Sequence, residues 1–496
     1  MEGKMSMRGK MKKKIFYAII YAAVALLVFL SVFTSCKSGK NTVPTLIWWQ
    51  IGGNSADLPR YSAYVSNYSE TKIGVRVDIR QATWAGAAQR FNAMINTGEY
   101  FDILFSDANT FTNFAMLGAF ADIGELVKEA SPKLYASMPK ELWLGVALDG
   151  KVYGVPTYKD SASTQYIFWD AALVDKYHLN IDDNSWQGWD ANFTKLKEGE
   201  GPRYYPYVMS KGEIDSVWLN YLELAPLFYP VGVRYDDPER RVVCTLEQSD
   251  VIEGLHYMHR WFDSGIINPD ANMIDTVPRY RPFFSAQAWP AVAASYATSA
   301  GIDKYIPSRY FGPLYSTKSI QGSINCISVN SKYKIEALKL LELVNTDPVF
   351  RDMISYGIEG DHFQYVTMPD DGRRAVQRLR NDWPLINYQL GNYFILTPEN
   401  TVAAGYWDEV RHLNETAFSS YILGFTFDIT PVENEVINCR NTWDHYYTDL
   451  RIGATDPDKT LPVVIAELKK KGLDKIIAEA QRQIDEFVKQ QQQQQQ

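Results

Sequence analysis

Cysteine and histidine are scarce in this chain of 496 residues, which has four cysteines and six histidines. Cys244, Cys326 and Cys439 are widely spaced and odd in number, so they predict neither a disulfide framework nor a CxxC metal site. The histidines show no HExxH spacing. We therefore expect no metal and no cofactor, and we expect these three cysteines to be mostly free, buried thiols.

An excess of positive charge is also missing. The chain has 50 basic and 58 acidic residues, and without residues 1–35 the balance is 44 to 57, a net charge near −13. This balance argues against nucleic acid or an anionic membrane face as a partner. The sequence also lacks GxSxG, P-loop and HExxH motifs and a GxGxxG turn after a strand, so no motif indicates an enzyme class.

Aromatic residues, in contrast, are abundant. The 13 tryptophans and 32 tyrosines are more than a core needs, and both residue types suit surfaces that stack on flat ligands carrying hydroxyl groups. The chain is too long for one hydrophobic core, which predicts two or three domains.

The N-terminal segment has the pattern of an export signal. The basic stretch MEGKMSMRGKMKKK precedes an apolar run over residues 15–33, as in the n-region and h-region of a signal peptide. The run is also long enough to span a bilayer, so a transmembrane anchor is the alternative. The sequence FTSC resembles a bacterial lipobox, which favours a signal peptide over residues 1–35 and lipidation of Cys36. Residues 36–44 then predict a flexible, lipid-anchored linker.

Alternating strands and helices predict an α/β fold. VRVDIRQA and FDILFSD read as strands and AGAAQRFNAMINTGE as a helix, which indicates a mostly parallel sheet that binds ligands at the carboxyl ends of its strands. Further along, DSVWLNYLELAPLF predicts a helix and WPAVAAS a strand. Residues 425–489 are expected to be helical, and residues 490–496 form a poly-Gln tail.

In order along the chain, several segments resemble the family 1 extracellular solute-binding lipoproteins of bacterial ABC importers. The segments are TLIWWQ, INTGEYFDILFSDANTFTNFAMLGAFADIGELV, DGKVYGVPTY, FWDAALVDKYHL, WFDSGIINPDA, NCISVNSKYKIEALKLLELVNTD and YGIEGDHFQY. GFTFDITPVENEV and the residues that follow it resemble the C-terminal domain of unknown function carried by one branch of that family.

The resemblance implies a periplasmic-binding-protein-like type II fold, in which two α/β lobes close on a solute and deliver it to a permease. We expect the first lobe to comprise residues 45–157 and 312–347, and the second to comprise residues 158–311 and 348–424. The crossings PTYKD and YFGPLY are expected to form the hinge.

Candidate solute-binding residues follow from the strand ends and from the resemblance. From the first lobe we expect Gln50, Asn54, Trp84, Asp107 and Asn109; from the hinge, Tyr158 and Asp160; from the second lobe, Trp218, Tyr296 and Trp407. An aromatic ring packs on the apolar face of a sugar, and the polar side chains bind its hydroxyl groups.

Each candidate has a structural alternative. Asp107 and Asn109 also suit the start of the following helix, Asp160 suits a solvated turn, and Trp218 and Trp407 suit a core. The pair Arg279 and Arg281 could hold a carboxylate of a uronic acid or a peptide, although exposed arginines beside proline usually serve solubility.

We therefore expect a lipid-anchored receptor in the cell envelope, facing the periplasm or the cell exterior. Its partners would be an oligosaccharide or similar small solute, ABC permease subunits, and the membrane through the lipid anchor. The alternative is a lipid-anchored glycoside hydrolase, because an aromatic cleft with many carboxylates suits glycan cleavage as well.

Overall fold

The computed structural model describes residues 43–53, 55–212, 216–225 and 228–494. The chain divides into two units, residues 1–44 and residues 45–496, and the fold described below is that of the second unit. The predicted lipidation site Cys36 and the candidate Asn54 lie outside the described residues.

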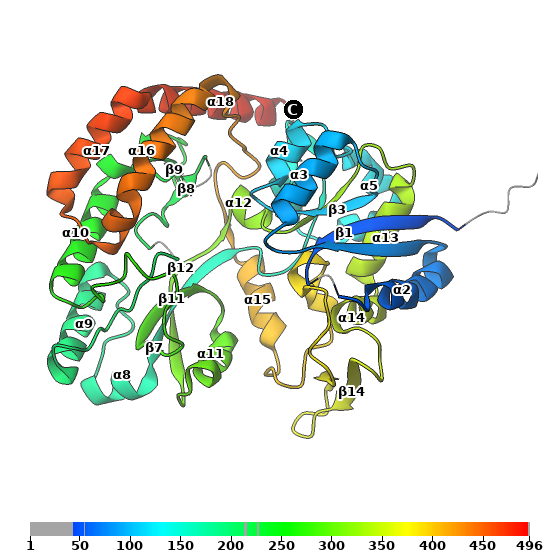
Figure 1. The fold of residues 1–496 in the computed structure, drawn as a ribbon, viewed down its shortest axis with the longest axis horizontal. Helices are drawn as coiled ribbons and strands as arrows, with labels where there is room; N and C mark the ends of the chain where they lie inside the picture. The colour runs from blue at the N-terminus through cyan, green and yellow to red at the C-terminus, as the bar shows by residue number, and fades with distance from the viewer. Residues whose placement is uncertain (1–42, 54, 213–215, 226–227, 495–496) are drawn as a thin grey trace, which may run out of the picture. The chain divides into compact units, whose positions relative to one another are not determined.

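The first lobe is built on a five-stranded sheet (Figure 1). Its strand order is β2-β1-β3-β13-β6, in which β1 pairs in parallel with β2 and β3, and β13 is antiparallel to β3 and β6. The strands are β1 (Thr45–Ile51), β2 (Arg76–Ala82), β3 (Ile103–Ser106), β6 (Val155–Pro156) and β13 (Ile324–Ile327).

Short helices and one small hairpin complete this lobe. The helices are α2 (Leu58–Ile73), α3 (Ala87–Thr97), α4 (Phe111–Met116), α5 (Gly124–Ala130), α6 (Pro132–Ala136), α7 (Lys140–Gly145), α12 (Thr317–Ile320), α13 (Lys334–Thr346) and α14 (Pro348–Tyr356), and the hairpin strands are β4 (Ala147–Leu148) and β5 (Lys151–Val152). Helix α2 has a proline in its first turn and ends at Gly74, whose φ of 68° is readily adopted by glycine. These elements enclose one core, which contains Trp48, Phe91 and Phe105.

The second lobe has two sheets. The larger has the order β11-β7-β12-β16 and the smaller the order β10-β9-β8. The strands are β7 (Ser163–Asp170), β8 (Tyr221–Glu223), β9 (Val231–Arg234), β10 (Val242–Cys244), β11 (Phe283–Gln287), β12 (Tyr305–Tyr315) and β16 (Phe418–Ser419), and the helices are α8 (Ala171–Tyr177), α9 (Trp186–Glu200), η1 (Thr245–Glu247), α10 (Ser249–Asp263), η2 (Pro290–Val292), α11 (Ala293–Ala300) and α15 (Tyr406–Glu415).

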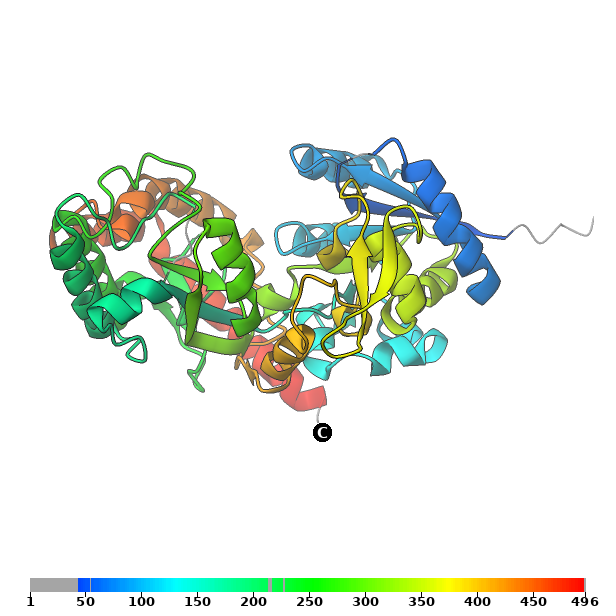
Figure 2. The same ribbon diagram turned by 90° about the horizontal axis from the view of Figure 1, so that it is seen from below.

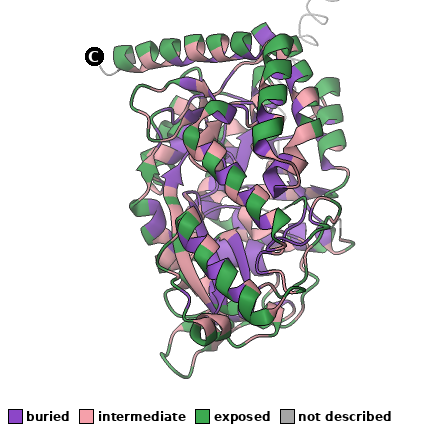
Figure 3. Cartoon of the chain, turned by 90° about the vertical axis from the view of Figure 1, so that its left-hand side faces the viewer, coloured by how far each residue is buried: buried purple, intermediate pink, exposed green. Residues whose placement is uncertain are grey.

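The C-terminal region is helical, as predicted, and belongs to the core of the second lobe. After η5 (Thr430–Val432) it forms α16 (Glu433–Ile452), α17 (Pro457–Lys471) and α18 (Leu473–Gln494). Helices α16 and α17 pack on α10, and α18 packs on β9 and β10 (Figure 1). Trp443, Val464 and Ile476 are fully buried with Trp261 in one cluster, and the helices are green on their outer faces and purple towards the strands (Figure 3).

Helix α14 (Pro348–Tyr356) and the segment that follows it, as far as Leu390, pack with the first lobe rather than the second. Helix α14 packs on α2 and α13, and its Phe350 and Ile354 join the first core together with Leu385 and Leu390. The hairpin β14 (Phe363–Thr367) and β15 (Arg374–Arg378) lies beside it (Figure 2), with Phe363 packed on Tyr356. The expected assignment to the second lobe therefore differs from the packing for residues 348–390, because α14 buries its apolar face against first-lobe helices, whereas β16 belongs to the larger second-lobe sheet as expected.

The chain passes between the sheets at the predicted hinge segments. Residues 157–162 connect β6 to β7, and β12 stays paired with β7 as far as Leu314 before the chain reaches β13. Asn414 of α15 holds the first crossing, because its side chain accepts a hydrogen bond from the Ala162 N–H (3.0 Å) and donates one to the Lys159 carbonyl (2.5 Å).

Two secondary-structure predictions are wrong. WPAVAAS forms η2 and the start of α11, because a proline in the first turn and an alanine-rich sequence favour helix. In the segment DSVWLNYLELAPLF, the described residues 216–225 form turns and β8, whose backbone pairs with β9. Tertiary pairing overrides local helical spacing there.

Within the described residues, the structure bears on membrane-spanning helices, metal sites and the state of the cysteines. None of their helices combines the length and apolar character required to cross a bilayer, and no cluster of their side chains could hold a metal ion. Cys244, Cys326 and Cys439 are free and buried, as predicted.

Candidate functional site

The first-lobe part of the site lies at the carboxyl ends of β1, β2 and β3. Trp84 follows β2, and Asp107 and Asn109 follow β3. Because parallel strands end at a common edge, these side chains come from the edge where α/β sheets bind ligands. The Trp84 side chain is 59% exposed. A large aromatic ring this exposed is available to stack on a ligand.

Tyr388 joins this edge from a distant part of the chain. Its ring stacks on Trp84 (centroids 6.5 Å apart, planes at 27°) and meets the buried Phe105 edge-on at 5.9 Å. Its carbonyl accepts a 2.6 Å hydrogen bond from Ser323 Oγ. Tyr388 therefore links the exposed indole to the first core.

Gln389 fixes the position of this segment. Its Oε1 accepts from the Ile51 N–H at 2.9 Å, and its Nε2 donates to the Ile51 carbonyl at 3.1 Å. Its own carbonyl accepts from Asn325 Nδ2 at 2.8 Å. The buried Gln389 side chain thus takes the place of a neighbouring strand residue at the end of β1.

A second set of rings surrounds Trp407. The ring centroid of Trp407 lies 4.6 Å from that of Tyr393, which is in η4 (Tyr393–Ile395). It lies 4.9 Å from the ring centroid of Tyr406 and 6.0 Å from that of Trp289. The Glu409 carboxylate accepts a 2.8 Å hydrogen bond from the Ala291 N–H and so ties α15 to η2. We refer to Trp84, Tyr388, Tyr393, Tyr406, Trp407 and Trp289 as the aromatic group.

Asp160 lies among these rings. Its Oδ1 accepts a 2.8 Å hydrogen bond from Lys159 Nζ, and its Oδ2 and its backbone carbonyl each accept from Gln287 Nε2 at 3.3 Å. Burial, with smaller contributions from the charges of Tyr296, Asp160 and Glu409, raises the pKa of Tyr406 to about 12. Burial also raises the pKa of Tyr393, where the charges of Asp160, Tyr406 and Tyr388 add and that of Arg351 opposes.

On the first lobe, the charge of Asp107 raises the pKa of a tyrosine, as the charge of Asp160 does for Tyr406. Burial raises the pKa of Tyr388, and the Asp107 charge adds to the rise. These phenol groups remain protonated at neutral pH and can donate hydrogen bonds to sugar hydroxyl groups. Asp107, Tyr388, Tyr393, Asp160 and Tyr406 are thus electrostatic neighbours, although they come from five places in the sequence.

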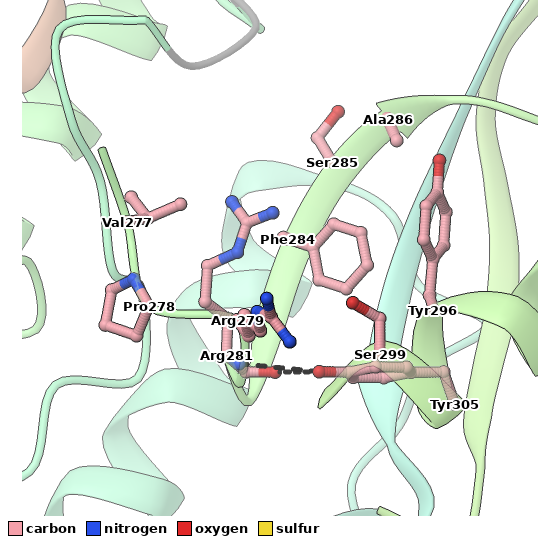
Figure 4. Close-up of a pocket in the computed structure, with 10 residues that line it drawn as sticks. All are labelled: Val277, Pro278, Arg279, Arg281, Phe284, Ser285, Ala286, Tyr296, Ser299 and Tyr305. Atoms are coloured by element: carbon pink, nitrogen blue, oxygen red, sulfur yellow. Dashed lines mark hydrogen bonds between the residues drawn. The ribbon is translucent and has the colours of Figure 1, made fainter. Parts of the chain in front are cut away.

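Among the predicted residues, Trp84, Asp107, Asp160, Tyr296 and Trp407 lie in or against this arrangement. Tyr296 is half-buried, meets Phe168 and Phe284 edge-on, and lines a pocket of about 310 Å³ on the second lobe (Figure 4). Asn109 is exposed. Asp107 Oδ1 accepts from the Asn109 N–H at 3.1 Å and from Thr110 Oγ1 at 3.0 Å, so Asp107 does shape the turn before α4, as its structural alternative predicted.

Three predicted residues have a different role from the one expected. Trp218 is only 2% exposed and packs on Trp443, so it is a core residue and offers no ring face to a solute. Gln50 is 1% exposed, and its Nε2 donates to Asn325 at 3.3 Å, so it supports the sheet edge from within. Tyr158 is 9% exposed, packs on Phe394 at 4.5 Å, and its carbonyl accepts from the Tyr393 N–H.

Sequence reasoning missed Tyr388, Gln389, Tyr393, Tyr406 and Trp289. A signal for most of them was present in the segment INYQLGNYF, where aromatic residues alternate with amide side chains, and Tyr406 directly precedes the predicted Trp407. Tyrosine and amide side chains together provide ring faces and hydrogen-bond donors and acceptors, as a site for a ligand with hydroxyl groups requires.

Comparison with known proteins identifies relatives over most of the chain. Residues 63–358 match the family described as bacterial extracellular solute-binding protein, and residues 421–489 match a domain of unknown function, DUF3502. A carbohydrate ABC transporter substrate-binding protein of Streptococcus pneumoniae serotype 4 is 27% identical over 455 residues, which cover 90% of this chain and 91% of the relative.

Solved structures agree with the fold. The N-glycan transport solute binding protein (NgtS) from Streptococcus pneumoniae superposes with a TM-score of 0.80 at 26% identity, over 90% of this chain and 99% of that chain. The same protein in complex with Man1GlcNAc gives a TM-score of 0.69, over 90% of this chain and 100% of that chain. The predicted α/β two-lobed fold and the predicted C-terminal domain are therefore confirmed.

Proposed function

We propose, on the premise that the chain belongs to the family of bacterial extracellular solute-binding proteins, that it captures an oligosaccharide between its lobes and delivers it to an ABC import permease. The observation that carries this proposal is the aromatic group with Asp107 and Asp160 among its rings. The exposed ring of Trp84 and the partly buried rings of the others suit the apolar faces of sugars, and carboxylates and phenols suit their hydroxyl groups.

The relatives support an oligosaccharide as the solute. One similar protein of known structure is an N-glycan transport solute binding protein, and one of its structures holds Man1GlcNAc. For this chain we propose that Trp84 and Trp407 stack on sugar rings, that Asp107, Asn109 and Asp160 bind hydroxyl groups, and that Tyr296 lies at the second-lobe border of the site. Gln50 and Tyr158 support these residues from beneath.

The cellular location is part of the same proposal. Export through the signal at residues 1–35, followed by lipidation of Cys36, would hold the receptor at the cell envelope, facing the periplasm or the exterior. The chain would then present captured solute to permease subunits in the same membrane.

We propose binding without chemistry. A glycoside hydrolase requires two carboxyl groups that flank the bond to be cleaved. The site carboxylates are already engaged, Asp107 with Asn109 and Thr110 in a turn, Asp160 with Lys159, and Glu409 with the Ala291 N–H. This arrangement suits holding a solute better than donating a proton to it.

Calorimetric titration of the full chain in detergent with Man1GlcNAc and a panel of neutral oligosaccharides tests the proposal. We expect saturable binding by at least one oligosaccharide, a raised melting temperature, and unchanged oligosaccharide after prolonged incubation. A ligand at a hundredfold excess over Kd stabilises the folded state by about 2.7 kcal/mol. Cleavage products would identify a hydrolase, and the absence of binding across the panel would refute the oligosaccharide receptor.

A further inference from the structure

A fully buried arginine lies next to the segment that carries two rings of the aromatic group. Arg351 belongs to α14, and its side chain is 0% exposed. The start of this helix is fixed, because the Asp347 side chain accepts hydrogen bonds from the Val349 N–H at 2.9 Å and from the Phe350 N–H at 3.1 Å. Arg351 therefore extends from a well-anchored element of the first lobe.

The Arg351 guanidinium binds backbone that has little regular structure. Its Nε donates to the Asn392 carbonyl at 3.0 Å, and its Nη2 donates to the carbonyls of Asn387 at 3.2 Å and Gly391 at 3.5 Å. Its Nη1 donates to Ser355 Oγ, one turn further along α14. Buried carbonyls outside helices and sheets need hydrogen-bond donors from elsewhere, and here the guanidinium provides them.

The same backbone carries two aromatic residues of the proposed site. We refer to residues 387–393 as the support segment. Its Tyr388 stacks on Trp84 with ring centroids 6.5 Å apart, and its Tyr393 lies against Trp407 with ring centroids 4.6 Å apart. The conformation of the support segment therefore sets the separation between the two tyrosines on which Trp84 and Trp407 rest.

Other side chains hold the middle of the support segment. Ser323 Oγ donates to the Tyr388 carbonyl at 2.6 Å, and Asn325 Nδ2 donates to the Gln389 carbonyl at 2.8 Å. Arg351 bonds both ends of the segment, and its Cζ also lies 5.4 Å from the centroid of the Tyr393 ring. It thus holds the segment as a loop of fixed width.

The burial of this charge opposes folding. The described hydrogen-bond acceptors of Arg351 are neutral oxygens, and the Asp352 carboxylate, whose charge acts on Arg351, already accepts from Thr397 and Tyr365. A buried cation without a bonded anion costs free energy that an apolar side chain of similar size would not. An arginine, however, offers five N–H donors in one planar fork and can bind several carbonyls at once. The contacts of Arg351 therefore indicate a role in placing the support segment rather than in filling the core.

We infer that Arg351 is a positioning residue for solute binding: by holding both ends of the support segment, it fixes the separation of Trp84 and Trp407 before a solute arrives. The inference rests on the proposed function, because it concerns how the same site recognises an oligosaccharide. A site whose rings are already in place loses less conformational freedom on binding than one that the ligand must order. Arg351 thereby favours oligosaccharides whose sugar rings match that separation.

Calorimetric titration of the full chain in detergent, with Man1GlcNAc and the same panel of neutral oligosaccharides, tests the inference. Arg351→Lys keeps the charge but loses the planar fork. We expect its affinity to fall by about 10- to 100-fold, since ordering each of the two tyrosines costs up to roughly tenfold in affinity. The loss should appear as a less favourable binding entropy, because the solute must then order the support segment.

Hydrogen exchange of the ligand-free protein gives a second readout. In Arg351→Lys, backbone amides of residues 386–396 should exchange faster than in wild type, and those of α9 in the second lobe should exchange at the wild-type rate. If Arg351→Lys does not fold, Ser355→Ala, which removes one acceptor of the guanidinium, replaces it in both measurements, with an expected affinity loss of about 2- to 10-fold.

Arg451→Lys is the matched control. Arg451 is also a buried arginine that donates to backbone carbonyls, those of Ser210 at 3.0 Å and Lys211 at 2.8 Å, but it lies in the core of the second lobe. The variant should lower the melting temperature and leave oligosaccharide affinity and binding entropy at their wild-type values.

Three results would overturn the inference. If folded Arg351→Lys binds with wild-type affinity and entropy, Arg351 does not position the site, and the receptor function stands. If Arg451→Lys loses as much affinity as Arg351→Lys, both losses reflect stability alone. If the wild type binds none of the oligosaccharides, the proposed function fails, and the inference fails with it.

Discussion

The indole of Trp84 stacks on the phenol of Tyr388, with ring centroids 6.5 Å apart and planes 27° from parallel. Trp84 follows strand β2, and Tyr388 lies in a segment that the hydrogen bonds of Gln389 hold at the end of β1. The pair forms an exposed aromatic face supported from below by Phe105. Its role in binding can be separated from its role in stability.

Trp84→Ala is expected to weaken oligosaccharide binding by on the order of 1 to 4 kcal/mol, as the loss of an aromatic anchor does, and to leave the melting temperature of the ligand-free protein nearly unchanged. The side chain is mostly exposed, so little packing is lost. Titration calorimetry and thermal unfolding on the same samples measure both quantities.

Trp218→Ala is the matched control, because the same substitution is made in a core. It should cost about 3 to 5 kcal/mol of unfolding free energy, since Trp218 packs on Trp443 and donates to Thr245 Oγ1 at 3.2 Å. If Trp84→Ala lowers ligand-free stability as much and leaves affinity untouched, Trp84 is a structural residue and the proposed site is wrong.

Gln389→Ala should destabilise the protein, because it leaves the N–H and carbonyl of Ile51 without the partner they now have. An unsatisfied buried polar group costs about 1 to 3 kcal/mol. Denaturant unfolding measures the loss. Gln364→Ala, at an exposed position in β14, is the control and should change stability little. Equal effects of the two substitutions would contradict the role of Gln389 at the end of β1.

Alkaline pH is expected to weaken the fold. Burial raises the pKa of Tyr406, Tyr204 and Tyr221 to about 12 in each case, whereas an unfolded tyrosine titrates near 10. The folded state therefore holds protons that the unfolded state releases, and the stability present below pH 10 is lost as the pH rises towards 12. Melting temperatures between pH 8 and 12 should fall, and Tyr406→Phe should flatten the fall. An unaltered slope in that variant would argue against burial of the Tyr406 phenol.

At the acidic end, hydrogen bonds from Arg60 and Arg380 lower the pKa of Asp361 to about 2. A carboxylate with a lowered pKa stabilises the fold above its unfolded pKa near 4, and this contribution disappears as the pH falls towards 2. Asp361→Asn should therefore lower the melting temperature at pH 6 and narrow the difference from wild type at pH 2. If the melting temperatures of wild type and Asp361→Asn differ by the same amount at pH 6 and pH 2, the charge of Asp361 does not contribute to stability.

The anchor makes a prediction of its own. Cys36→Ala removes the thiol that would accept lipid, so the variant should accumulate as an uncleaved or poorly processed precursor. Metabolic labelling with a fatty acid compares the two proteins. Equal label in both would refute lipidation at Cys36.

How far the sequence predicts this molecule depends on the range of the interactions involved. The sequence predicts strand β2 from local alternation, β3 from a short apolar run, and helix α3 from helical spacing that ends at a glycine. The strand prediction for residues 289–295 was wrong because a short apolar run with alanines fits both a strand and a buried helix. The alanine-rich composition and the proline in the first turn favour the helix that forms there.

The site was only partly predictable for a related reason. Trp84, Asp107 and Asp160 stand at ends of elements that the sequence itself reveals. Tyr388 and Tyr393 reach the site through hydrogen bonds of Gln389 and Arg351 with distant backbone, and no local pattern encodes those partners. Likewise, no sequence pattern near Trp218 predicts that Trp443, from the C-terminal region, packs on it.

Asn414 gives the hinge a mechanical property. It bonds the backbone on both sides of the crossing segment, at Lys159 and Ala162, and it lies in the same helix as Tyr406 and Trp407. A hydrogen-bonded helix transmits displacement along its length, since bending it requires a proline, a bulge or an inserted side chain. Rotation of the crossing backbone therefore moves the rings at the other end of α15. Trp407 would change its position together with the hinge, and contact with the solute would not be needed to move it.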